Sequence, residues 1–197
     1  MGTLKMLFGA AAVLGIGYAV FGSSGVQTAD LGQALDRTER ALISYGKDLE
    51  RKEVDALTPK EIGELNSVLR REMNAPQPFH DAKIGVAMTE EASFIGFSDQ
   101  NANNIWEQGD KQLFHIEIDN ENQRLIATDM SGNSTHSGSS NNSHFGGFLF
   151  ISLRDRQRAA GIAPGSFNGR KTTPRSSYQA PKSARSRARS GGILGGK

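Results

Sequence analysis

Residues 84–128, IGVAMTEEASFIGFSDQNANNIWEQGDKQLFHIEIDNENQRLIAT, decide the fold of this chain. Apolar side chains recur there at every second position within short runs, which is the period of a half-buried β-strand. Acidic and amide-rich turns separate the apolar runs, so successive strands pair as neighbours. The pattern predicts an antiparallel β-meander of four strands, centred on residues 84–88, 94–97, 114–118 and 125–128.

Before this stretch the apolar spacing changes to alternating steps of four and three residues, the period of a helix. A stripe beginning at Leu31 predicts one amphipathic helix from about Asp30 to Ala56. The sequence TPKE at residues 58–61 predicts a second helix start, because threonine caps, proline fits the first turn and glutamate completes a capping box. This second helix ends by Asn74, ahead of two prolines.

Two amphipathic helices followed by a meander predict a small α+β domain, which we assign to residues 30–130. One face of so small a sheet must be buried, and we expect the apolar faces of the two helices to pack against it. About a hundred residues are enough for one core.

The N-terminal 29 residues contain a long stretch without a charge, residues 6–29. Its apolar part, residues 6–22, spans about 25 Å as a helix, close to the thickness of a thin bilayer. We therefore expect a single-pass transmembrane helix that anchors the protein in the cell membrane. A cleaved signal peptide is the alternative, with a small-residue site at residues 22–24.

Charges around this segment predict its orientation. Lys5 precedes it and the next basic residue is Arg37, so the positive-inside rule places the N-terminus in the cytoplasm and the domain in the periplasm. Within the segment, small residues at every fourth position allow two membrane helices to approach closely. They are Ala11, Gly15 and Ala19, and they are the candidate helix-packing residues.

The C-terminal part has three predicted sections. Residues 131–147 are nearly all Ser, Asn, Gly and His, which predicts a flexible linker. Residues 148–163 begin with a six-residue apolar run followed by arginines. This section is either a final strand or short packed element, or an amphipathic segment on a membrane surface. Residues 164–197 are rich in Ser, Gly, Pro and Arg and are predicted to be a disordered basic tail.

Charge is divided unevenly along the chain. Residues 154–197 carry eleven Lys and Arg against one Asp, a net charge of +10, whereas residues 1–153 carry a net charge of −8. Arginines spaced among serines suit contacts to phosphates, so the tail is a candidate anion-binding segment. The candidate residues are Arg170, Lys171, Arg175, Lys182, Arg185, Arg187 and Arg189. Anionic lipid or an acidic protein is the candidate partner of the tail if the domain lies outside the membrane, and nucleic acid is a candidate only if the tail is cytoplasmic.

Catalytic signatures are weak. The chain has no cysteine, which excludes disulfides, thiolate metal sites and a cysteine nucleophile. His115 and Glu117 share one face of a predicted strand, where a metal would need a third ligand that the sequence does not supply. The carboxylates Asp99, Glu107, Asp110 and Asp119 are interpreted as solubilising loop residues rather than as an acid–base set. No catalytic residue, metal site or cofactor is predicted.

Three functional hypotheses follow from this layout. The first is a non-enzymatic, membrane-anchored scaffold or accessory protein of the cell envelope, which acts through a protein partner or as a homo-oligomer. The second is an anionic-surface binding protein that acts through its basic tail. The third is a hydrolase that uses the loop carboxylates or the His115 and Glu117 pair, and it requires those residues to meet in one pocket.

Overall fold

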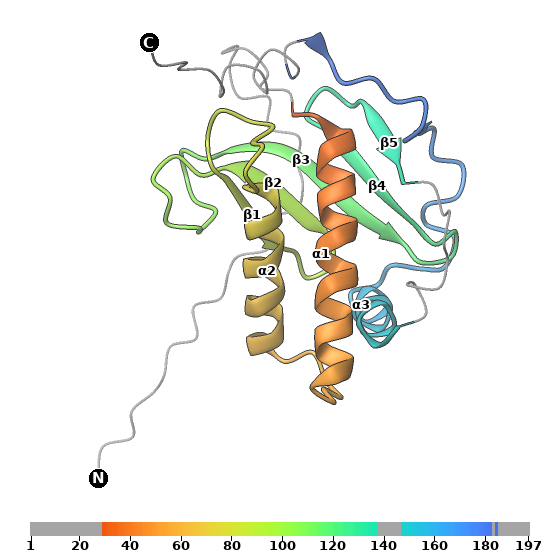
Figure 1. Cartoon of the computed structure of the whole chain (residues 1–197). Coiled ribbons are helices and arrows are strands. Elements are labelled where there is room, and N and C mark those ends of the chain that lie inside the picture. The colour runs from red at the N-terminus through yellow and green to blue at the C-terminus, as the bar shows by residue number, and fades with distance from the viewer. Residues whose placement is uncertain (1–28, 138–146, 183, 185–197) are drawn as a thin grey trace.

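Helices cover one face of a β-sheet in the computed structural model, which describes residues 29–137, 147–182 and 184 (Figure 1). The helices are α1 (Leu31–Arg51), α2 (Pro59–Met73) and α3 (Phe148–Ala159). α1 and α2 run side by side across the sheet, and α3 packs beside α1. The predicted α+β class is confirmed.

The sheet has its strands in sequence order, and each neighbouring pair is antiparallel except the last. Its strands are β1 (Ile84–Met88), β2 (Phe94–Ser98), β3 (Lys111–Asp119), β4 (Arg124–Asp129), β5 (Ser134–His136) and β6 (Thr173–Pro174). The first four strands form the predicted meander. β5 extends it, and β6 pairs with β5 in parallel, so the complete sheet is mixed.

α1 begins as predicted, because the Asp30 side chain accepts hydrogen bonds from the backbone N–H groups of Gly32 and Gln33. It ends at Arg51 rather than at Ala56. Glu53 has a φ of 53°, and the N–H groups of Glu53 and Val54 donate to the carbonyls of Glu50 and Leu49. This Schellman arrangement turns the chain out of the helix, and Val54 then packs on the core.

α2 begins at the predicted position, but the Thr58 N–H donates to the carbonyl of Ala56 and not to Glu61, so the reciprocal bond of a capping box is not formed. Thr58 is the N-cap, its hydroxyl accepts from the N–H of Lys60, and it also contacts the Glu61 carboxylate. Pro59 is the first helical residue and Asn74 is the C-cap.

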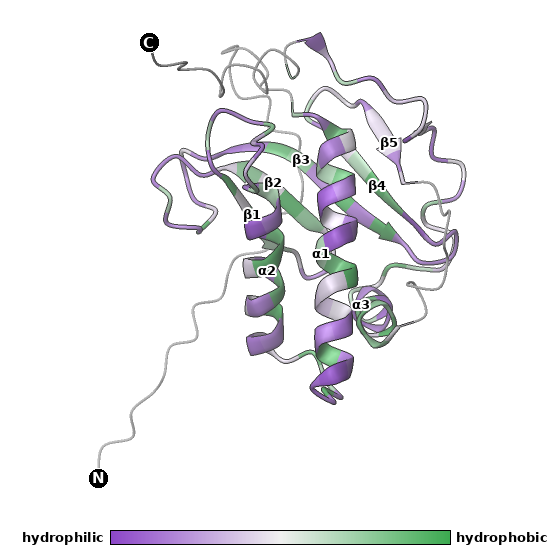
Figure 2. Cartoon of the chain, in the orientation of Figure 1, coloured by the Kyte–Doolittle hydropathy of each residue, from purple (hydrophilic) through white to green (hydrophobic). Residues whose placement is uncertain are grey.

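The core lies between the helices and the inner face of the sheet. The hydropathy colouring shows the apolar sides of α1 and α2 turned toward the strands (Figure 2). The largest buried side chains of this core are Leu31, Leu35, Leu42, Leu49, Leu65, Leu69, Met73, Phe79, Phe94, Phe114 and Ile84. The apolar faces of both helices are therefore buried against the sheet, as their spacing predicts.

One cation is also buried in this layer. Arg37 on α1 is 5% exposed, and its guanidinium donates to the carbonyls of Glu72, Met73 and Gln77. The guanidinium carbon lies 4.9 Å from the centre of the Phe79 ring. Arg37 thus satisfies carbonyls that the end of α2 leaves without helical partners.

The C-terminal third differs from the sequence prediction. Residues 134–136 form β5 inside the predicted linker, because Thr135 and His136 pair with both β4 and β6. Residues 148–159 form a helix, which is one form of the predicted packed element. Leu149 and Leu153 are one turn apart and buried in the core shared with α1.

The prediction of a disordered tail is wrong for residues 164–182. β6 lies in this segment, and the N–H of Arg175 donates to the carbonyl of His136 at 2.8 Å. The Thr135 hydroxyl donates to the carbonyl of Thr173, also at 2.8 Å. The backbone groups and the Thr135 hydroxyl at the edge of β5 form these hydrogen bonds. They order the segment without burying apolar side chains, which is why its polar composition did not reveal them. Residues 185–197 lie outside the described residues.

The predicted membrane segment, including Ala11, Gly15 and Ala19, also lies outside the described residues. In the part of the chain that is described, no helix has both the length and the apolar character needed to cross a membrane.

Candidate functional site

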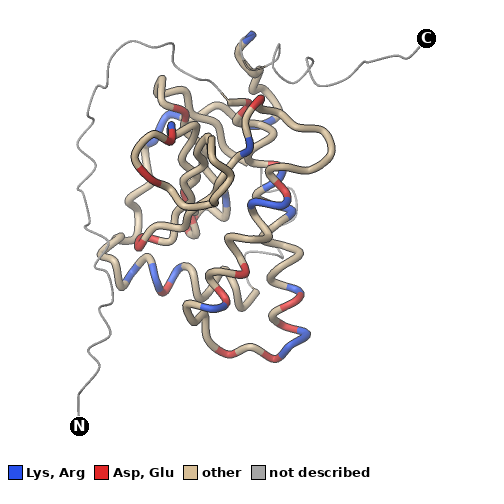
Figure 3. The backbone as a smooth tube through the Cα atoms, turned by 90° about the vertical axis from the view of Figure 1, so that its left-hand side faces the viewer, with Lys and Arg blue, Asp and Glu red and all other residues tan. Residues whose placement is uncertain are grey.

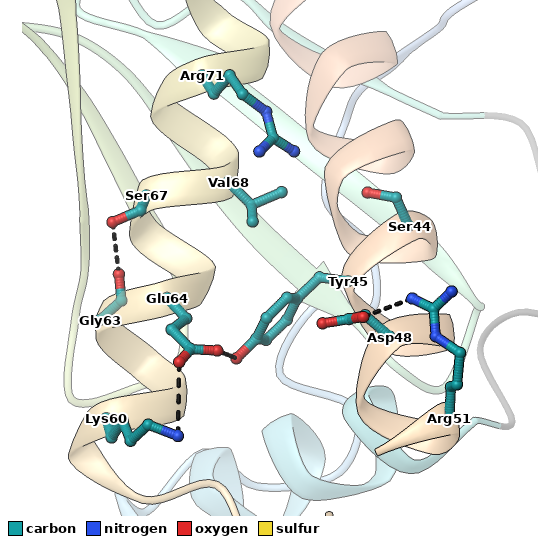
Figure 4. Close-up of a pocket in the computed structure, with 10 residues that line it drawn as sticks. All are labelled: Ser44, Tyr45, Asp48, Arg51, Lys60, Gly63, Glu64, Ser67, Val68 and Arg71. Atoms are coloured by element: carbon teal, nitrogen blue, oxygen red, sulfur yellow. Dashed lines mark hydrogen bonds and ion pairs between the residues drawn. The ribbon is translucent and has the colours of Figure 1, made fainter.

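A groove on the described surface lies between α1 and α2, with a volume of about 670 Å³ (Figure 4). Its α1 wall consists of Ser44, Tyr45, Asp48 and Arg51, and its α2 wall of Lys60, Gly63, Glu64, Ser67, Val68 and Arg71. These residues recur every three or four positions, on the flank of each helix next to the buried stripe. The groove is therefore a consequence of two amphipathic helices lying side by side.

Tyr45 connects the two walls of this groove. Its hydroxyl donates to the backbone carbonyl of Glu61 at 2.9 Å and lies 3.4 Å from a Glu64 carboxylate oxygen. Burial, followed by the nearby Glu64 carboxylate, raises the pKa of the Tyr45 phenol well above its ordinary value. The phenol consequently stays protonated and acts only as a neutral donor or acceptor.

Charges on the walls are mostly paired. Asp48 accepts from Arg51 and Lys52, which lowers the pKa of its carboxyl, and Lys60 lies 3.6 Å from Glu64. The Arg71 guanidinium has no hydrogen-bond or ion-pair partner among the described residues, and it extends from α2 toward α1 (Figure 4). Basic and acidic positions are interspersed along both helices (Figure 3). The groove thus has a local unpaired positive charge rather than a broad basic surface.

The structure brings two of the predicted anion-binding residues into ion pairs within the domain. Arg170 contacts Glu117 on β3, and Arg175 is bound by Asp36 on α1. Lys171 and Lys182 are exposed. Arg185, Arg187 and Arg189 lie outside the described residues. The described part of the tail is thus bound to the acidic domain, as the opposite charges of the two regions favour.

His115 and Glu117 lie on one face of β3, as predicted, but they do not form a metal pair. The Nε2 atom of His115 lies 2.7 Å from the hydroxyl of Ser93, and Glu117 contacts Arg170. Burial is the main cause of a lowered pKa for His115, which keeps the imidazole neutral. Ser93 is 4% exposed and His115 is half-buried, so the serine hydroxyl is largely shielded from solution.

The loop carboxylates are not all solubilising. Asp119 is 1% exposed and holds the turn after β3, because it accepts from the N–H and side chain of Asn122 and from Arg124. Asp99, at the end of β2, is 3% exposed. Glu107 and Asp110 lie in the same β2–β3 loop as Asp99. Among the described residues, no three His, Asp or Glu side chains gather as metal ligands.

Sequence reasoning missed the groove. The residues that line the groove are mostly polar. Only the apolar face of each helix was considered in the sequence, so these polar positions were not examined as a site. Ser44, Asp48 and Arg51 on α1, and Glu64, Ser67 and Arg71 on α2, recur at helical spacing, which was the available signal.

Comparison with known proteins gives no identification. No family model matches the sequence, and neither the curated proteins nor the solved structures provide a match.

Proposed function

We propose that this chain is a non-enzymatic, membrane-tethered scaffold or accessory protein of the cell envelope, which holds an acidic segment of a protein partner in the α1–α2 groove. The observation that carries the proposal is the groove itself. It has room for several side chains, and it offers the Arg71 guanidinium, which no described residue pairs.

The groove walls favour a peptide over a small apolar ligand. Ser44 and Ser67 are exposed and line it from opposite helices, and each hydroxyl donates to a carbonyl of its own helix and can accept a hydrogen bond from a partner. Val68 is half-buried between them and supplies an apolar contact. A partner carboxylate would pair with Arg71, since an arginine fork matches carboxylate geometry.

The tether in this proposal is the apolar segment of residues 6–22. Its length supports a single membrane crossing. A domain held at a membrane meets a partner on the same membrane at a high effective concentration, so that a groove of modest affinity is sufficient.

A photo-crosslinking experiment in cells tests this function. A photoreactive residue is placed at Ser44 or Ser67 in the groove, and at Ser131, an exposed serine in the β4–β5 turn, as the matched control. We expect the two groove positions to give the same adduct in the membrane fraction and Ser131 to give none.

A charge reversal completes the test. Arg71→Glu should abolish the groove adduct, whereas Arg158→Glu, an exposed arginine on α3, should leave it unchanged. Adducts that form equally at Ser131, or that survive Arg71→Glu, would contradict the proposal.

A further inference from the structure

The C-terminal segment of the domain lies against the first turn of α1. The Tyr178 hydroxyl accepts a hydrogen bond from the N–H of Leu31 at 3.2 Å, although the two residues are 147 positions apart in the sequence. The Arg175 guanidinium lies over Gly32, where an added Cβ atom would be 2.7 Å from its central carbon. Figure 1 shows the end of the described C-terminal segment and the start of α1 at the same end of the domain. We call this surface, around Leu31 and Tyr178, the α1 pole.

Specific contacts fix both segments at the α1 pole. Asp36 on α1 binds Arg175 through both carboxylate oxygens, at 3.0 and 2.7 Å. The N–H of Arg175 also donates to the carbonyl of His136 at 2.8 Å, which joins the segment to the sheet. Ala29, directly before α1, is fully buried, and Ala184 is 1% exposed. The places at which the chain leaves the described domain are therefore packed against it.

The predicted membrane tether limits how far the α1 pole can lie from a bilayer. The apolar segment ends at Gly22, and only residues 23–28 separate it from Ala29. An extended chain spans at most about 3.6 Å per residue, so these two residues are at most about 25 Å apart. α1 has 21 residues and therefore extends about 30 Å from the pole. With the apolar segment in the membrane, the α1 pole is held near the bilayer, and the loop after α1 can lie farther away.

Basic residues follow the α1 pole in the sequence. No Asp or Glu occurs after Asp155. Ala184 is six positions after Tyr178, so it lies at most about 22 Å from that residue. The basic residues around and directly after Ala184 are Lys182, Arg185, Arg187 and Arg189. They thus begin within reach of the surface that the tether holds near the membrane.

Proximity decides whether such charges bind lipid. Salt screens the attraction between a basic side chain and an anionic membrane beyond about 10 Å at 0.1 M ionic strength. A basic segment consequently adds to membrane binding only where the fold holds it close to the headgroups. An apolar segment combined with a polybasic segment is a two-part membrane attachment, in which the arginines pair with lipid phosphates.

We propose that the α1 pole faces the membrane, and that the basic residues beside it bind the phosphate groups of anionic lipids in the membrane that holds the tether. These residues are Lys182, Arg185, Arg187 and Arg189. The inference rests on the membrane tether of the proposed function, and it adds an orientation of the domain and a second contact with the lipid. The loop between α1 and α2 lies on the side away from the bilayer in this orientation.

Site-specific energy transfer to the membrane tests the orientation. The chain has no cysteine, so single cysteines can be labelled without background. Ser177→Cys places a fluorescent donor at the α1 pole, and Ala56→Cys places it in the α1–α2 loop; both positions are exposed. The full chain is reconstituted into phosphatidylcholine vesicles whose headgroups carry an acceptor. We expect transfer from Ser177→Cys to be about twofold or more above that from Ala56→Cys, since the length of α1 separates the positions.

A third label tests the lipid contact. Ser190→Cys carries the donor next to the basic residues, and the vesicles contain either phosphatidylcholine alone or about two parts phosphatidylcholine to one part phosphatidylglycerol. Phosphatidylglycerol should increase the transfer, and about 0.5 M NaCl should reverse the increase. Combined Arg187→Gln and Arg189→Gln should remove at least half of the increase. Combined Arg154→Gln and Arg158→Gln, on α3, is the matched control and should retain it.

The outcomes separate this inference from the function on which it rests. Equal transfer from Ser177→Cys and Ala56→Cys would overturn the orientation and leave the tether intact. An Ser190→Cys signal that phosphatidylglycerol does not raise, or that survives the loss of both arginines, would overturn the lipid contact. Absence of transfer from all three positions would contradict the membrane tether itself, and with it both proposals.

Discussion

Arg175, in the C-terminal segment, forms a two-pronged ion pair with Asp36 on α1, 139 positions earlier in the chain. Its Nε atom lies 3.0 Å from one carboxylate oxygen and its Nη2 atom 2.7 Å from the other. The guanidinium lies over Gly32, where a Cβ atom would be 2.7 Å from its central carbon. Nearby, the Tyr178 hydroxyl accepts from the N–H of Leu31 at 3.2 Å. The basic segment is thereby bound to the first turns of α1.

Loss of the two-pronged ion pair between Arg175 and Asp36 should increase the mobility of residues 164–182. Arg175→Lys retains the charge but not the paired geometry, so we expect faster proteolytic cleavage within residues 164–182. Both side chains are more than a third exposed, and the change in the free energy of unfolding should be about 1 kcal/mol or less. Limited proteolysis with mass spectrometry measures the cleavage. Arg158→Lys, on exposed α3 surface, is the control, and equal cleavage of both variants would refute the role of the fork.

Arg37 should be far more important for stability than its neighbour Arg40. Arg37→Met leaves the buried carbonyls at the end of α2 without donors, so we expect a loss of about 2–4 kcal/mol in the free energy of unfolding. The Arg40 side chain is 57% exposed, and Arg40→Met should cost about 0.5 kcal/mol or less. Urea denaturation compares the two variants, and similar midpoints would contradict the assigned role of Arg37.

Replacement of two glycines by alanine should change the free energy of unfolding in opposite directions. A Cβ atom on Gly96 would lie 2.1 Å from the Phe114 ring, in the buried layer of the sheet, so Gly96→Ala should cost about 1–3 kcal/mol. Gly63 lies inside α2 with no atom within 4 Å of its added Cβ. Gly63→Ala should therefore stabilise by about 0.5–1 kcal/mol. Thermal melting tests the pair, and a Gly96→Ala variant as stable as the parent would be the contrary result.

Stability should fall as the pH drops from about 7 to 5. Burial lowers the pKa of His115 below its ordinary 6.5, and the facing charges of Glu117, Arg170 and Glu91 modify that shift. The unfolded chain therefore takes up a proton more readily than the folded chain does, so acid favours unfolding. Burial lowers the pKa of His136 in the same direction. His115→Gln should flatten the dependence of the unfolding free energy on pH, and an unchanged slope would exclude His115 as a source.

The hypothesis of anionic-surface binding can be tested on the basic residues of the tail that lie outside the described residues. Removal of residues 185–197 eliminates Arg185, Arg187 and Arg189, each worth about 1 kcal/mol at an anionic surface. We expect at least tenfold weaker, salt-sensitive binding to phosphatidylglycerol vesicles in a flotation assay. Arg170→Gln should have a smaller effect, because Arg170 is paired with Glu117. Undiminished binding after truncation would eliminate this hypothesis.

Features encoded by adjacent residues were predicted correctly. The capping residues of α2 act within one helical turn, and the alternation in β1 to β4 acts between strands that follow one another in the sequence. The end of α1 was missed because Glu53 adopts the left-handed conformation that usually marks a helix end with glycine, and the sequence has no glycine there. The burial of Asp99 and Asp119 was also missed, because those carboxylates were interpreted only as solubilising residues.

Local sequence periodicity by itself determined the α+β class, the two long helices and the four-stranded meander, because those elements depend on which side chains face a core. Only the tertiary structure decided the position of residues 164–182 and the partners of Arg37, Arg170 and Arg175. An arginine in a polar segment has the same local pattern whether it meets solvent or a carboxylate 139 positions away. Ion pairs and edge-strand bonds have no period, so their partners are fixed only when the folded chain brings them together.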